Sequence, residues 1–168
     1  MISRPHLSLT VSAFRILAIG SLIAACQAAA VAPRTSSGEC PLTLPNGSTP
    51  PGERPSPFHY GNGAIWTALW PDGIVRADQD YIDASGAIAM KWPWWRASGA
   101  VGSLNIDGQR IDGGAPPLGV VIAEGYGDRG FQATTLIFPT EGCWEITARA
   151  GRGQLSLVTE VVLASSAP

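Results

Sequence analysis

Short apolar runs separated by turn signals dominate the chain after residue 57. Nine such runs stand at 64–70, 73–77, 87–92, 101–106, 109–111, 118–123, 131–138, 144–150 and 154–163. Gly, Pro or Asp-Gly pairs separate many of them, as is typical of the connections between strands. No segment after residue 27 keeps a helical period. The pattern predicts an all-β sandwich of about eight or nine antiparallel strands over residues 58–168.

Two of the turn signals predict hairpins. The sequence PDG at 71–73 is expected to join the runs on either side of it, and DG at 107–108 is expected to do the same. Because a strand sends alternate side chains to opposite faces, each run is expected to present one apolar face to a shared core.

The sequence FPTEGCWEITARA at 138–150 gives the most specific indication of the fold. Trp144, Ile146 and Ala148 share one face of the expected strand, directly after the turn at Gly142. This arrangement resembles the corner between strands E and F of immunoglobulin-like domains, with Trp144 in place of the tyrosine of antibody-type domains. The resemblance implies an immunoglobulin-like β-sandwich, but a fold does not by itself imply a function.

The N-terminus carries a short apolar segment preceded by positive charge. Arg4 and Arg15 precede an apolar run at 16–25, too short to span a bilayer because a helix needs about 20 residues for that. The run ends in IAAC at 23–26 and resembles the lipobox of bacterial lipoproteins. The resemblance implies a signal peptide at 1–25, lipidation of Cys26 and a membrane-anchored, extracytoplasmic place in the cell envelope. An ordinary signal peptide with a chance cysteine, or a short buried helix, would explain the same residues.

Charge and composition narrow the class of partner. Loss of residues 1–25 would remove Arg4 and Arg15, which leaves nine of the 11 basic residues against 13 acidic residues. Lys91 is the only lysine of the chain, and no basic cluster is present. The sequence therefore argues against nucleic acid as a partner.

A proline-rich stretch links the lipobox to the run of strands. Seven of the 14 prolines lie within 33–57, so residues 26–57 are expected to form an extended tether. Cys40 and Cys143 are the cysteines left after Cys26, and in an exported protein they predict a disulfide, with two separate thiols as the alternative. Such a bond would lay residues 40–53 along the domain.

Few residues are candidates for catalysis or metal binding. His59 is the one histidine after the signal peptide, without a G-x-S-x-G motif, and is expected to be a loop residue. The carboxylates of Asp78, Asp80 and Asp83 lack an EF-hand spacing and are expected to form a solvated turn. A G-x-G-x-x-G match at 125–130 precedes a strand and not a helix, so it predicts a mobile loop. No catalytic residue, metal site or cofactor is predicted.

The sequence KWPWWR at 91–96 holds three of the six tryptophans. Alternation sends Trp92 to the core, while a proline at 93 belongs at an edge or a bulge and leaves the direction of Trp94 open. Trp95 and Arg96 lie beyond the proline and are expected at the surface. Trp95, Trp94, Arg96 and Trp70 are therefore the candidate ligand-binding residues, suited to a saccharide or an envelope protein.

These observations predict a non-catalytic, lipid-anchored binding or interaction module of unknown ligand. One alternative is a structural accessory subunit of a cell-envelope complex. The other is a hydrolase that uses the carboxylates within 78–83.

Overall fold

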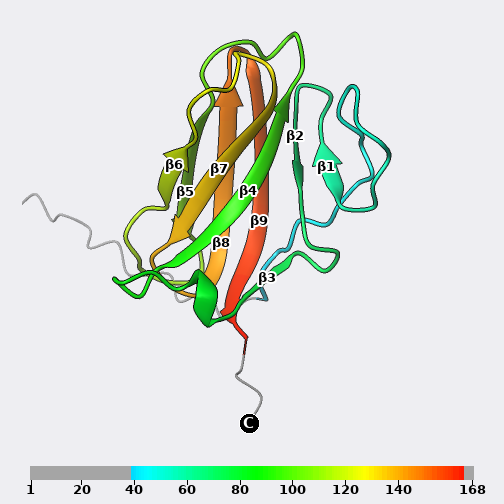
Figure 1. Cartoon of the computed structure of the whole chain (residues 1–168). Coiled ribbons are helices and arrows are strands. Elements are labelled where there is room, and N and C mark those ends of the chain that lie inside the picture. The colour runs from blue at the N-terminus through cyan, green and yellow to red at the C-terminus, as the bar shows by residue number, and fades with distance from the viewer. Residues whose placement is uncertain (1–38, 165–168) are drawn as a thin grey trace, which may run out of the picture. The chain divides into compact units, whose positions relative to one another are not determined.

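The computed structural model describes residues 39–164, so the predicted signal peptide and Cys26 lie outside the described residues. Residues Pro33–Pro168 form one compact unit by themselves. Within the described range the chain forms one short 3-10 helix, η1 (Gln79–Tyr81), and nine strands (Figure 1): β1 (His59–Gly61), β2 (Ile65–Ala68), β3 (Ile74–Ala77), β4 (Ile88–Arg96), β5 (Asn105–Arg110), β6 (Gly119–Ile122), β7 (Gly130–Phe138), β8 (Gly142–Ala150) and β9 (Gly153–Leu163).

The strands form two sheets that pack face to face. The five-stranded sheet has the order β1-β2-β4-β7-β6, and the four-stranded sheet has the order β3-β9-β8-β5 (Figure 1). This confirms the predicted all-β sandwich. One pairing departs from the antiparallel expectation, because β3 runs parallel to β9 with Val75 opposite Val161.

The structure contains neither of the two hairpins that the turn signals predict, so both predictions are wrong. Residues 71–73 carry the chain from β2 in one sheet to β3 in the other, so the two strands do not pair. Gly108 lies inside β5, where a Cβ atom would come within 2.8 Å of the Leu118 side chain and 3.0 Å of the Glu145 carbonyl oxygen. Glycine is present there because neighbouring atoms approach the backbone closely, and not because the chain turns.

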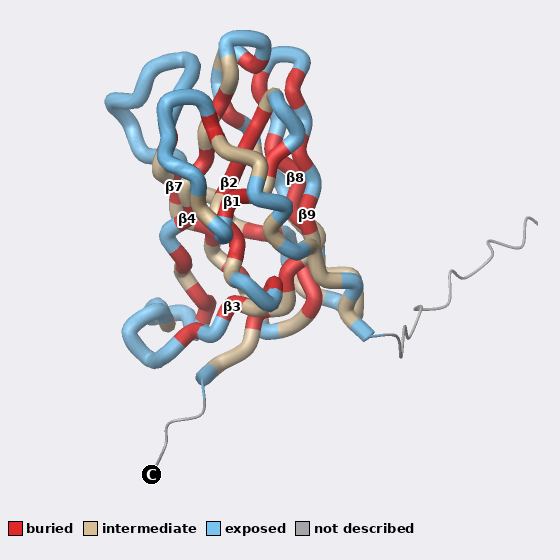
Figure 2. The backbone as a smooth tube through the Cα atoms, turned by 90° about the vertical axis from the view of Figure 1, so that its right-hand side faces the viewer, coloured by how far each residue is buried: buried red, intermediate tan, exposed pale blue. Residues whose placement is uncertain are grey.

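The core lies between the sheets and is rich in aromatic side chains. Burial alternates along β4, β7 and β9, while β8 is buried along most of its length (Figure 2). The largest fully buried side chains are Trp92, Trp94, Trp144, Phe138, Ile65, Leu136, Ile146, Leu157, Val75 and Val161. Trp144 therefore packs in the core, as its place on the predicted strand implies.

Pro93 lies inside β4 without breaking the alternation of that strand. Thr67 Oγ1 donates a 2.8 Å hydrogen bond to the Pro93 carbonyl oxygen, so this backbone unit faces β2 and not β7. The pairing of β4 with β2 reaches Trp94 and ends there. The missing N–H of Pro93 therefore removes no ladder hydrogen bond, and the strand continues past it.

Residues 39–57 lie along the sandwich. Cys40 and Cys143 form a disulfide with a Cα–Cα distance of 5.7 Å, which confirms the predicted pairing. Thr43 exchanges hydrogen bonds with Val158 of β9, at 2.9 Å through its N–H and 2.8 Å through its hydroxyl oxygen. The second part of the predicted tether is thus part of the domain. Residues 39–164 contain no helix that is long and apolar enough to cross a membrane.

Candidate binding groove on the five-stranded sheet

The outer face of the five-stranded sheet is where Trp95 lies. Alternation along β4 turns Lys91, Pro93 and Trp95 away from the core. The antiparallel register places Trp95 opposite Phe131 of β7 and Pro93 opposite Ala133. Outward residues of the two strands therefore form rows that cross the sheet.

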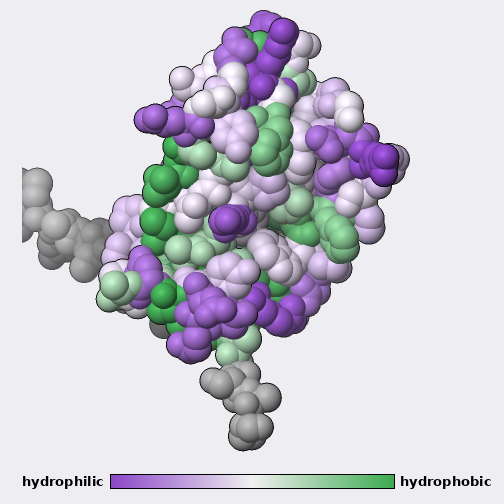
Figure 3. Space-filling view, in the orientation of Figure 1, coloured by the Kyte–Doolittle hydropathy of each residue, from purple (hydrophilic) through white to green (hydrophobic). Residues whose placement is uncertain are grey.

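Two apolar pockets meet at Pro93 on this face. The first has a volume of about 380 Å³ and is lined by β4, β6 and β7, with Lys91, Pro93, Val121, Phe131, Ala133 and Thr135 among its residues. The second, of about 250 Å³, is lined by Phe58, Ala68, Leu69, Trp70, Pro71 and Pro93. We call these two pockets together the Pro93 groove. Figure 3 shows the same face, with strongly hydrophobic surface along its β6 side.

A row of four aromatic rings includes Phe131, which lines the first pocket of the groove. The ring centroids of His59 and Trp95 are 5.4 Å apart, those of Trp95 and Phe131 5.4 Å, and those of Phe131 and Tyr126 5.6 Å. Each pair packs edge to face, which is a favourable aromatic geometry. Phe131 is 42% exposed and Tyr126 is 41% exposed, so the end of the row near β7 is open to a ligand.

Trp95 is partly buried within this row. Its indole N–H donates a 3.0 Å hydrogen bond to the carboxylate of Glu53, in the segment that precedes β1. Trp66, its neighbour on β2, is buried and donates its indole N–H to the hydroxyl of Ser48 at 2.9 Å. Ser48 and Glu53 thus fix the positions of both indole rings.

Trp94 was expected to be a ligand contact, and its burial corrects that expectation. The side chain is 0% exposed, and its indole N–H donates to the hydroxyl of Thr134 within the core. Alternation continues through Pro93, so Trp94 returns to the inner face together with Trp92. A ligand on the outer face cannot reach it.

Arg96 is also buried, at 3% exposure, which corrects its expected surface role. Its guanidinium donates to the carbonyl oxygens of Gly102 and Gly127 and, at 3.0 Å, to the side-chain oxygen of Gln132. Burial lowers the pKa of Arg96 because it disfavours the charged form, while the charge of Asp128 acts in the opposite direction. Arg96 therefore fastens two loops at one end of the sandwich.

Trp70 lies beside the groove. It is partly buried, and its ring centroid lies 5.2 Å from that of Trp92. Its outer side lines the second pocket together with Phe58, which is 46% exposed. Of the four residues predicted from sequence, Trp70 lines the groove. Trp95 lines neither pocket but packs against Phe131, which does, and the other two lie inside the protein.

The sequence interpretation missed Phe58, Phe131, Tyr126 and Val121. Tyr126 lies in the segment 125–130, which is expected to form a mobile loop, and Phe131 begins the expected strand 131–138 without being considered as a ligand contact. Phe131 begins the outward row of β7, and alternation from the buried Phe138 would have placed it on the outer face.

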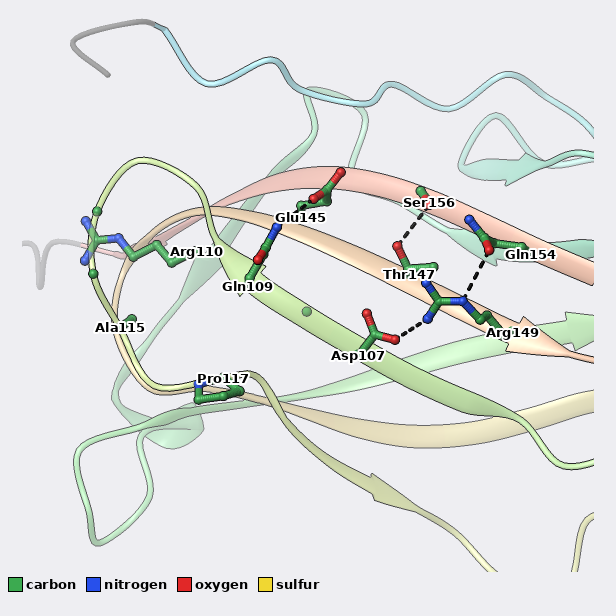
Figure 4. A pocket seen from close by; sticks show the side chains of 13 residues that line it. Asp107, Gln109, Arg110, Ala115, Pro117, Glu145, Thr147, Arg149, Gln154 and Ser156 are labelled. Atoms are coloured by element: carbon green, nitrogen blue, oxygen red, sulfur yellow. Dashed lines mark hydrogen bonds and ion pairs between the residues drawn. The ribbon is translucent and has the colours of Figure 1, made fainter. Parts of the chain in front are cut away.

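The outer face of the opposite sheet carries a pocket of about 690 Å³, but its polar groups bind one another (Figure 4). Arg149 pairs with Asp107 and with Gln154, and Gln109 donates to Glu145 at 3.1 Å. This is the expected solvated face of an antiparallel sheet. The Pro93 groove instead exposes apolar rings and branched side chains to solvent.

The residues considered for catalysis and metal binding do not assemble into one site. His59 is 7% exposed and packs against Trp95. Asp78 caps η1, and Asp83 accepts hydrogen bonds from Ser85, which lower the pKa of its carboxyl. Within residues 39–164, no group of three or more His, Cys, Asp or Glu side chains could hold a metal ion.

Comparisons of this chain with protein-family models, with curated proteins and with solved structures found no match.

Proposed function

We propose that the chain is a non-catalytic, lipid-anchored binding module of the cell envelope and that it holds its ligand in the Pro93 groove. The observation that carries this proposal is the pair of apolar pockets that meet at Pro93 and are bordered by exposed aromatic rings. Concave apolar surface on the solvent side of a sheet is unusual in a monomer and is typical of binding sites.

The chemistry of the groove favours a protein segment over a saccharide. Its lining is mostly apolar, and Lys91 is the one charged side chain among the residues that line the two pockets. A sugar carries many hydroxyl groups, and each loses hydrogen bonds with water when an apolar surface covers it. An extended or helical segment with apolar side chains on both sides of an acidic residue would fill both pockets and pair with Lys91.

A saccharide is the second candidate, and the aromatic row supports it. Phe131 and Tyr126 present exposed rings, and aromatic rings can stack on the apolar face of a sugar. A glycan array separates the two candidates, because a saccharide ligand would bind the array and lose binding in Phe131→Ser.

Lipid anchoring is tested on the full chain in a bacterial host. Metabolic labelling with radioactive palmitate is expected to label the protein, and Cys26→Ser is expected to abolish the label and to leave the precursor uncleaved. If Cys26→Ser is labelled as strongly as the parent chain, the lipobox interpretation is wrong.

Ligand binding is tested on residues 33–168, the compact unit. Selection from a random peptide library is expected to enrich apolar sequences that contain an acidic residue. Their affinity should fall at least about tenfold, or about 1.4 kcal/mol, in Phe131→Ser and in Lys91→Glu. Leu44→Ser is the matched control, because Leu44 is 56% exposed and does not line the groove. Equal affinity in all four proteins would refute the assignment of the groove.

A further inference from the structure

The two sheets have four edge strands, and three of them are protected from pairing with another chain. The backbone of β1 is covered by Asn46, whose side chain bonds both the N–H and the C=O of Gly61. The short strand β3 carries Arg76, in a 2.7 Å ion pair with Asp72. β5 carries charged side chains, among them Asp107. Short strands, charges and covering segments are the usual ways in which proteins block their sheet edges.

β6 is the exception among these edges. Its four residues, GVVI, carry no charge and no proline. Val121 is 55% exposed and Ile122 is 39% exposed. An uncharged edge with exposed β-branched side chains is a template for the addition of another strand.

The hydrogen bonds of β6 show which backbone groups face the open edge. The N–H of Ala123 donates to the Ala133 carbonyl oxygen of β7 at 3.3 Å, and the antiparallel pattern alternates from that residue. Val121 therefore faces β7, while Val120 and Ile122 direct their N–H and C=O groups away from it. Within residues 39–164, these outward groups have no partner.

We propose that β6 pairs with β6 of a second copy of this chain, antiparallel, about a two-fold axis that passes between the two Val121 residues. In this register Val120 of one copy lies opposite Ile122 of the other. Each such pair exchanges both of its hydrogen bonds, so all the open groups of both strands are satisfied.

Two other two-fold registers would require hydrogen bonds from residues outside β6. A register centred on Val120 would require the N–H of Leu118, which already donates to the Gly108 carbonyl oxygen at 3.0 Å. A register centred on Ile122 would require Glu124, which lies beyond the end of the strand. Of these three registers, the one centred on Val121 is the one in which every hydrogen-bonded residue belongs to β6.

Self-pairing also explains the composition of the edge. Because the strand carries no charge, a second copy brings no like charges together within it. The two Val121 side chains, exposed in one copy, would pack against each other on the outer face. The two five-stranded sheets would then form one continuous sheet, with the Pro93 grooves on the same face.

A single short strand buries little surface, so we expect a weak dimer in solution. Two copies confined to one membrane by lipid anchors would meet at a higher effective concentration.

The test uses residues 33–168, in which the native cysteines form the Cys40–Cys143 disulfide. Val121→Cys then carries the only free thiol. In the proposed register the two residues at position 121 form a non-hydrogen-bonded pair with Cα atoms about 4.5 Å apart, which suits a disulfide. Air oxidation is expected to give a covalent dimer at least about ten times faster than in Leu44→Cys, whose thiol would be equally exposed.

A second variant tests the non-covalent dimer. Sedimentation equilibrium at millimolar protein is expected to show dimers of the parent domain and none of Val121→Lys, because this change places two like charges at the axis. Unchanged melting temperature would show that Val121→Lys folds. Equal oxidation rates for the two cysteine variants, or a parent domain that stays monomeric at this concentration, would overturn the proposal.

Discussion

The hydroxyl of Thr67 is the most informative single group to remove. It accepts a 2.7 Å hydrogen bond from the indole N–H of Trp92 and donates a 2.8 Å hydrogen bond to the Pro93 carbonyl oxygen. Thr67 is 0% exposed and Trp92 is 1% exposed, so water cannot easily replace the first bond. Thr67→Val keeps the shape of the side chain and removes both hydrogen bonds.

The expected loss follows from the two groups left without partners. A buried polar group without a hydrogen bond costs about 1–3 kcal/mol. The Trp92 N–H is buried and should cost the upper part of this range, while the partly buried Pro93 carbonyl should cost the lower part. We therefore expect Thr67→Val to lower the free energy of unfolding by about 2–4 kcal/mol. Thr67→Ser keeps the hydroxyl and is the matched control.

Thr134 provides an internal comparison. Its hydroxyl accepts from the Trp94 indole N–H at 3.2 Å and donates to the Trp92 carbonyl oxygen at 3.0 Å, and both of these bonds are buried. Thr134→Val should therefore cost at least as much as Thr67→Val. Denaturant unfolding of residues 33–168, followed by tryptophan fluorescence, measures both values. A loss below about 0.5 kcal/mol for both valine variants would refute the reasoning.

Two other features of the fold give measurable expectations. Replacement of both Cys40 and Cys143 by serine is expected to lower the free energy of unfolding by about 3–5 kcal/mol in denaturant titrations, because the bond closes a loop of about 100 residues. The pKa of Asp112 is lowered mainly by its hydrogen bond with Arg110, so its contribution to stability is complete above the unfolded pKa of about 3.9 and is lost as the pH falls through the lower folded value. Asp112→Asn should therefore be less stable than the parent at pH 7, and the difference should shrink below about pH 4; a difference that grows in acid would contradict this assignment.

The fold class was predictable because hydrophobic alternation and turn residues are local properties of a sequence. The same signals failed where tertiary contacts decide the outcome. Gly108 follows an aspartate as in a hairpin turn, yet it lies inside β5, where Leu118 and Glu145 leave no room for a Cβ atom. The parallel pairing of β3 with β9 likewise joins segments that are far apart in the chain, and no local pattern indicates it.

The Pro93 groove was predictable in part for a related reason. Alternation from Trp92 places Trp95 on the outer face, and only the treatment of Pro93 as a break left Trp94 uncertain. The register that brings Phe131 opposite Trp95 depends on how β4 and β7 align, and the sequence does not specify that alignment. The contact between Trp95 and Phe131 is therefore made by pairing between strands more than 30 residues apart.

Arg96 shows how a residue expected to contact a ligand can instead hold loops together from inside the protein. A buried guanidinium loses its hydration, so it requires acceptors such as the oxygens of Gly102, Gly127 and Gln132. Gly127 directly follows Tyr126, the last ring of the aromatic row. The hydrogen bond to Gly127 thus fixes the loop that presents this ring. Lysine would keep the charge but lack the planar set of donors that reaches three separate oxygens, so position 96 requires arginine to hold the loops at Gly102 and Gly127 in place.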